Sequence, residues 1–179
     1  MNIKVMSRQE ALAYSYKQDV DNYIIVSISC PGETGPVFYT PSNPEDVRCK
    51  AVLKLHFNDI DRPYEDKEPK EEQLIGLKAF IDTFKDNPEI KDIIVHCAAG
   101  ISRSSAVAAA ICQYLGLNEL DIIWSNYIYK PNTLVYKLAL KELGLKWREE
   151  QFAYYLAMNK LERDKLEIPE DVESLFKEI

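Results

Sequence analysis

"DIIVHCAAGISRSSAVAAAICQYLG" (residues 92–116) contains three kinds of local structure in one short stretch. The segment DIIVHC is apolar and β-branched, which predicts a buried strand that ends at Cys97. The run from Ser102 onward is rich in small residues and predicts a helix that lies deep in the core. Gly100 between them permits a tight turn. A strand, a tight loop and a helix form the unit from which α/β sheets are built.

The rest of the chain alternates strands with helices. We predict further strands at residues 23–29 and 51–57, and helices at residues 8–16, 74–84, 118–129, 131–144 and 148–165. Ser7 and Glu10 form a capping box, and Gly144 marks a helix end. Short helical turns are also predicted at Pro44, capped by Asn43, and after Pro169. The fold class is therefore α/β, with a central, mostly parallel sheet flanked by helices.

Length and charge limit the possible functions. A chain of 179 residues is expected to form one domain, residues 1–179. Its net charge of −7, with no basic stripe, argues against binding to nucleic acid or to anionic membrane surfaces. The N-terminus lacks the apolar core of a signal peptide, and no run is long enough to span a bilayer. We expect a cytoplasmic monomer.

The cysteines do not form a metal-binding or disulfide pattern. No CxxC pair is present, only His56 and His96 accompany them, and the chain is too large for a secreted disulfide scaffold. We therefore expect no metal and no cofactor. Cys30 has the chemistry to form a disulfide with Cys97 under oxidation, but nothing in the sequence requires it.

The loop after Cys97 combines a nucleophile with an anion cradle. A helix N-terminus leaves backbone N–H groups unpaired and carries partial positive charge, which favours a bound anion and a thiolate. Arg103 adds a two-pronged donor that matches phosphate oxygens. Cysteines in such settings have pKa values of roughly 3.5–7.5. The predicted phosphate-binding residues are Ala98, Ala99, Gly100, Ile101, Ser102 and Arg103.

A phosphate monoester fits this cradle. The Cys97 thiolate would attack phosphorus, Arg103 and the loop amides would hold the equatorial oxygens, and water would then release phosphate from a phosphocysteine. Ser104 is placed to donate to the sulfur and ease its departure. The expected substrate is a phosphorylated protein or a small phosphomonoester.

The run "VHCAAGISRSSA" resembles the signature loop of the cysteine-based protein tyrosine and dual-specificity phosphatases: His-Cys, five residues, Arg-Ser. "YKPNTLVYKL" is similar to the Pro-Asn segment of dual-specificity members, and it implies that Asn132 braces the loop. His96 would orient the Cys97 backbone. The likeness covers roughly residues 23–144, and it is nearest to compact prokaryotic forms. It implies a protein tyrosine phosphatase-like fold.

The leaving group needs a proton. The family places its acid on a mobile loop upstream of the cysteine, and "FNDID" resembles the Asn-Asp opening of that loop, which favours Asp59. The spacing from Asp59 to Cys97 exceeds that of compact members, so Asp61 is the alternative general acid, with Asp66 third.

The sequence leaves open which phosphorylated substrate the protein hydrolyses and whether it is instead a non-catalytic binding protein. Dual specificity towards phosphoserine and phosphothreonine depends on the depth of the pocket. Phosphoinositide-type members carry lysines inside the loop, and "CAAGISR" has none. A non-catalytic phosphate-binding module would usually lack the cysteine, the arginine or the acid. Hydrolysis of a protein phosphotyrosine is therefore the preferred hypothesis, with a small-molecule or phosphoinositide phosphatase and the binding module as alternatives.

Overall fold

A four-stranded parallel sheet organises the chain, which we describe from a computed structural model covering residues 1–17, 19–33, 48–62 and 64–167. The strands are β1 (Asn2–Ser7), β2 (Asn22–Ser29), β3 (Cys49–His56) and β4 (Ile90–Cys97). The helices are α1 (Arg8–Ser15), α2 (Leu77–Phe84), α3 (Arg103–Tyr114), α4 (Thr133–Glu142) and α5 (Glu149–Glu167), with short helical turns η1 (Glu71–Gln73) and η2 (Leu120–Trp124).

The strand order β1-β4-β2-β3 places β4 and β2 at the centre of the sheet. All of these pairings are parallel, and Ser7 at the end of β1 lies opposite Cys97 at the end of β4. A parallel sheet needs cover on both faces, which explains the continuous apolar runs in its central strands. The predicted α/β class with a parallel sheet is confirmed.

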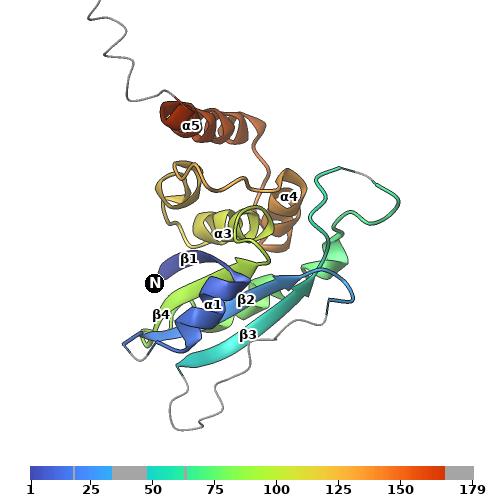
Figure 1. Cartoon of the computed structure of the whole chain (residues 1–179). Coiled ribbons are helices and arrows are strands. Elements are labelled where there is room, and N and C mark those ends of the chain that lie inside the picture. Colours follow the sequence, from blue (N-terminus) through green and yellow to red (C-terminus); the bar gives the residue numbers. More distant parts are fainter. Residues whose placement is uncertain (18, 34–47, 63, 168–179) are drawn as a thin grey trace, which may run out of the picture.

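Helices cover the two faces unequally (Figure 1). On one face, α1 packs Ala11 and Tyr14 against Tyr23, Ile25 and Ile94 of the sheet. On the other face, α2, α3 and α4 form a larger core with the alternate residues of the same strands. The alanines of α3 are fully buried, because small side chains let this helix lie close to the sheet.

Helix α5 forms a further layer, outside α3 and α4 and away from the sheet (Figure 1). Phe152 and Tyr155 of this helix pack on Trp124. The buried amide of Asn159 donates to the carbonyls of Trp124, Asn126 and Tyr129 at 3.0, 3.1 and 3.2 Å. These three bonds fix α5 to the segment that leads into α4.

The structure adds one strand that the sequence did not predict and corrects one predicted helix. Strand β1 was not expected, although residues 2–7 pair along the whole edge of β4. The helix predicted at residues 118–129 is only the single turn η2. There the buried Glu119 carboxylate accepts hydrogen bonds from Trp124 Nε1 and Tyr136 Oη. The Asn159 amide donates to the Asn126 carbonyl, which in a continuing helix would accept a backbone N–H.

The predicted ends of other elements agree with the structure. The Ser7–Glu10 capping box is present, and Gly144 follows the end of α4 with φ of +76°. The helical turns expected at Pro44 and after Pro169 lie outside the described residues. No helix in the described ranges has the length and apolar character needed to cross a bilayer.

Candidate active site

The candidate phosphate loop connects the end of β4 to the start of α3. Cys97 is the last residue of the strand and Arg103 the first residue of the helix, and both are buried. Ala98 and Ala99 are exposed, whereas Ile101 and Ser102 are half-buried. Ser102 is the N-cap of α3, but its side chain makes no capping hydrogen bond. The loop therefore ends at a helix N-terminus whose backbone N–H groups are not capped by the Ser102 side chain.

The Cys97 thiol is surrounded by donors. Its Sγ lies 3.2 Å from Ser104 Oγ and accepts from the Gly100 N–H at 3.3 Å. Burial acts to raise the pKa of this thiol, but the Ser104 side chain and backbone, the Gly100 N–H and the Arg103 charge outweigh it. The pKa of Cys97 is therefore lowered, because each donor stabilises the thiolate. By contrast, burial raises the pKa of Cys49 to about 11 and that of Cys112 to about 12.

Replacing Ser104 with alanine should raise the pKa of Cys97, because the thiolate loses its side-chain donor. The rate of alkylation by iodoacetamide, measured as a function of pH, should rise at a higher pH than in wild type. The thiol should therefore react more slowly near neutral pH. Ser105→Ala is the matched control, since the Ser105 hydroxyl donates to the carbonyls of Ile101 and Ser102 rather than to the sulfur. An unmoved profile in Ser104→Ala would contradict the assignment. Alkylation of Cys97→Ser provides the background.

Gly100 is required by its position against β1. Its φ is +75°, a conformation that side chains disfavour. A Cβ here would lie 2.6 Å from the carbonyl carbon of Met6 and closer still to the amide nitrogen of Ser7. Both are backbone atoms, which cannot move aside as a flexible side chain would. The close approach of β1 therefore shapes the curve of the loop.

Arg103 is held by groups that arrive from the ends of other strands. Its Nη1 donates to the Phe57 carbonyl at 3.0 Å, just after β3, and to Cys30 Sγ at 3.2 Å, just after β2. Its Nε lies 3.9 Å from Asp59 Oδ2. This buried Nε has no hydrogen-bond partner among the described residues. A buried donor without a partner is costly, and it marks a position that an anion would satisfy.

Asp59 is tied directly to the loop. Its Oδ1 accepts from Ser102 Oγ at 2.7 Å and from Asn132 Nδ2 at 2.9 Å. Both donors use the same oxygen, so Oδ2 is left facing Arg103 without a hydrogen bond among the described residues. The structure thus brings Asp59 next to the phosphate loop.

Asn132 connects this carboxylate to α4. Its Oδ1 caps the helix by accepting from the Val135 N–H at 3.0 Å, while its own N–H donates to the Ser102 carbonyl at 3.3 Å. The Lys130 N–H donates to the Ile101 carbonyl at 3.0 Å. The Pro-Asn segment therefore contacts the phosphate loop through its backbone and Asp59 through its side chain.

The other two candidate acids lie differently. Asp61 is exposed and lines the same cavity as Asp59, a space of about 420 Å³ beside Ser102. Its carboxylate has no hydrogen bond or ion pair within the described part of the chain. Asp66 pairs with Lys70 at 3.7 Å and is not among the residues that line this cavity.

His96 lies on β4 directly before the cysteine, and it is 1% exposed. Burial lowers its pKa to about 4, and a hydrogen bond with the Cys97 backbone acts in the opposite direction. The imidazole is therefore neutral at physiological pH. Its hydrogen bond with the Cys97 backbone joins it to the start of the loop.

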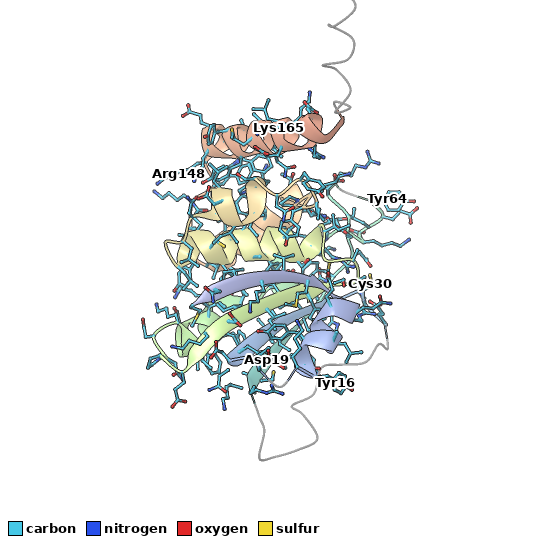
Figure 2. All side chains as sticks on the ribbon, turned by 60° about the vertical axis from the view of Figure 1, so that its left-hand side comes forward. Tyr16, Asp19, Cys30, Tyr64, Arg148 and Lys165 are labelled. Atoms are coloured by element: carbon cyan, nitrogen blue, oxygen red, sulfur yellow. The ribbon has the colours of Figure 1, made fainter. Side chains whose placement is uncertain are left out.

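Sequence reasoning missed Arg8 and Glu33, which lie at the rim of the loop. The Arg8 N–H donates to the Ala98 carbonyl at 3.3 Å, and its Nη1 donates to Glu33 Oε1 at 2.6 Å. Arg8 and the Cys30 N–H lower the pKa of Glu33 to about 2. Figure 2 shows Cys30 at the end of the sheet near the start of α1. The missing signal was β1: a strand ending at Ser7 beside β4 would have placed Arg8 at the loop.

Among the residues described, no group of three or more His, Cys, Asp or Glu side chains is arranged to hold a metal ion. Around the loop lie neutral donors, the buried Arg103, the Cys97 thiol and the Asp59 carboxylate, with the Arg8–Glu33 ion pair at the rim. Chemically, this arrangement can bind an oxyanion and present a sulfur nucleophile to it.

Solved structures with a similar chain path include two phosphatase-related proteins. A crystal structure of human tyrosine phosphatase-like serine/threonine/tyrosine-interacting protein is 21% identical, aligns over 85% of this chain and 87% of that chain, and has a TM-score of 0.43. A crystal structure of Tk-PTP in the active form is 20% identical over 88% and 90% of the two chains, with a TM-score of 0.40. No protein-family model and no curated protein matches the chain. The identities are too low to transfer a residue's role from either protein.

Proposed function

We propose that this protein is a phosphomonoesterase, and specifically a protein tyrosine phosphatase that acts through a phosphocysteine on Cys97. One observation carries the proposal: a buried thiol with a lowered pKa shares a seven-residue loop with Arg103, whose buried Nε has no hydrogen-bond partner in the described structure. One helix N-terminus thus carries both a nucleophile and a guanidinium with an N–H donor that is free among the described residues. A phosphate dianion can bind to these groups and be attacked by the thiolate. The resemblance of this loop to the phosphatase signature agrees with it.

In the first step, the Cys97 thiolate attacks phosphorus in line with the ester oxygen. The S–P bond forms as the O–P bond breaks, and the loop amides and Arg103 hold the three equatorial oxygens. The leaving oxygen takes a proton from Asp59. Its Oδ2 is the suitable atom, because Oδ1 already accepts two hydrogen bonds.

In the second step, water attacks the phosphocysteine. Asp59, now ionised, takes a proton from that water, and the S–P bond breaks to release inorganic phosphate. The sulfur leaves as a thiolate, which Ser104 and the Gly100 N–H stabilise as they do in the free protein. The catalyst is then restored.

The loop favours a substrate with one phosphate at the reacting position. Between Cys97 and Arg103 it carries no charged side chain that would bind a second phosphate. Dual specificity is the runner-up, and it shares every step above. Matched peptides that bear phosphotyrosine, phosphoserine or phosphothreonine distinguish the two.

The test is hydrolysis of para-nitrophenyl phosphate by the full chain in the presence of EDTA. We expect turnover that EDTA does not affect and that orthovanadate blocks, because vanadate mimics the five-coordinate phosphorus in the loop. Acid quenching during turnover should trap phosphate on Cys97, detected by peptide mass spectrometry. A folded protein without turnover would instead favour a phosphate-binding module, and loss of turnover in EDTA would indicate a metal enzyme.

A further inference from the structure

A polar cavity of about 420 Å³ opens beside the phosphate loop. The loop contributes only Ser102 to it, and neither Cys97 nor Arg103 is part of its lining. Its other walls come from the Asp59 loop, from residues 130–133 and from α5. The cavity therefore lies next to the site of phosphate transfer, where it would contact the remainder of a substrate and not the reacting phosphate.

Two cations line this cavity, Lys130 and Arg163. Neither side chain has an ion pair or hydrogen bond within the described residues. Other cations of this acidic chain do pair with carboxylates, as in Lys70–Asp66 and Arg8–Glu33. Two unpaired positive charges facing one space make it attractive to an anion.

The positions of both cations are fixed by the fold. Lys130 is held against the loop by its backbone bond to the Ile101 carbonyl. Arg163 lies one helical turn after Asn159, so the two residues share a face of α5. The three bonds from Asn159 anchor this face to the segment that carries Lys130. Both charges are therefore carried by anchored backbone at the edge of the same cavity.

The carboxylates in the cavity do not neutralise these cations. Asp59 directs Oδ1 to Ser102 and Asn132, and its Oδ2 faces Arg103. Asp61 makes no ion pair in the described structure. An incoming anion would be attracted by Lys130 and Arg163 and repelled by Asp61, so it would bind where the two cations are nearest.

We propose that Lys130 and Arg163 form an accessory anion subsite that binds an acidic side chain flanking the phosphorylated residue of a protein substrate. The inference rests on the proposed function and narrows its substrate class to phosphopeptides with a nearby aspartate or glutamate. Neighbouring residues of an extended peptide are about 3.5 Å apart, so a flanking side chain reaches a space that adjoins the loop.

The test compares phosphopeptides that carry Glu or Gln at each flanking position in turn. The readout is the ratio of kcat/KM for the Glu peptide to that for its Gln partner, so changes in the chemical step cancel. Wild type should prefer Glu at one position or more, and Lys130→Gln and Arg163→Gln should each lower that ratio about three- to fivefold. The preference should weaken as salt increases, since the cations are solvent-accessible.

Lys160→Gln is the matched control, because it removes the same charge from an exposed position of α5 outside the cavity. Its ratio should equal that of wild type. Arg163→Glu should reverse the preference towards peptides with a flanking lysine. Equal rates for Glu and Gln peptides in wild type would overturn the subsite while leaving the proposed function intact. Failure of wild type on para-nitrophenyl phosphate would instead remove the proposed function itself.

Discussion

Replacing Cys97 with serine should abolish hydrolysis, lowering kcat by roughly 10⁴-fold or more, while orthovanadate still binds. A serine hydroxyl is not ionised near neutral pH, so the loop keeps its donors and loses its nucleophile. The Ser104 hydroxyl, the Gly100 N–H and Arg103 remain in place for the oxyanion. Turnover of para-nitrophenyl phosphate and the thermal shift caused by vanadate measure the two properties separately.

Cys49→Ser is the control for this experiment. Cys49 is also buried, and its sulfur already donates to the Ala51 carbonyl, so a serine finds the same acceptor. That variant should keep wild-type turnover. If Cys97→Ser retained activity, the nucleophile would have to lie elsewhere. If it lost both turnover and vanadate binding yet stayed folded, the loop would not be the oxyanion site.

Replacing Asp59 with asparagine should lower kcat strongly for phosphotyrosine or phenyl phosphate, and weakly for para-nitrophenyl phosphate. An amide oxygen can still accept from Ser102 and Asn132, so the attachment to the loop is kept while the acidic proton is lost. General acids contribute about 10²- to 10⁴-fold for poor leaving groups. An activated nitrophenolate departs without that help. The dependence of kcat on the pKa of the leaving group measures the effect.

Asp61→Asn decides between the two candidates. Asp61 lines the same cavity but has no hydrogen bond or ion pair with the phosphate loop in the described structure, so its removal should change kcat little for any leaving group. The opposite pattern, with a leaving-group effect in Asp61→Asn only, would make Asp61 the acid and Asp59 a positioning residue that holds the loop.

The centre of the fold was predictable because its sequence pattern is local. An apolar strand, Gly100 and an alanine-rich helix follow one another in the chain. The hydrophobic pattern and composition therefore indicate that Cys97 ends a strand and that Arg103 begins the next helix. The capping box at Ser7 and the stop at Gly144 are equally local. Resemblance suggested Asp59 and Asn132 separately, but their hydrogen bond and the one from Ser102 to Asp59 were not predicted, since they join segments distant in sequence.

Strand β1 and turn η2 could not be predicted for the same reason. Residues 2–7 are short and carry polar side chains, and they form a strand because β4 offers an edge some 90 positions later. The helical pattern of residues 118–129 is overridden by Glu119 and by the Asn159 amide of α5. Arg8 and Glu33 were missed as a direct result of the first omission.

The pairing of β1 with β4 has a consequence for how the proposed active site forms as the chain folds. Asn2 donates to Asp92 across 90 positions, so β1 cannot dock until β4, the last strand of the sheet, has been synthesised. Contacts this distant in sequence form slowly. Because Met6 and Ser7 are the backbone against which Gly100 curves, the loop lacks its wall until that docking occurs. During refolding, secondary structure should therefore recover before vanadate binding does, and a nascent chain should remain inactive until β1 completes the sheet.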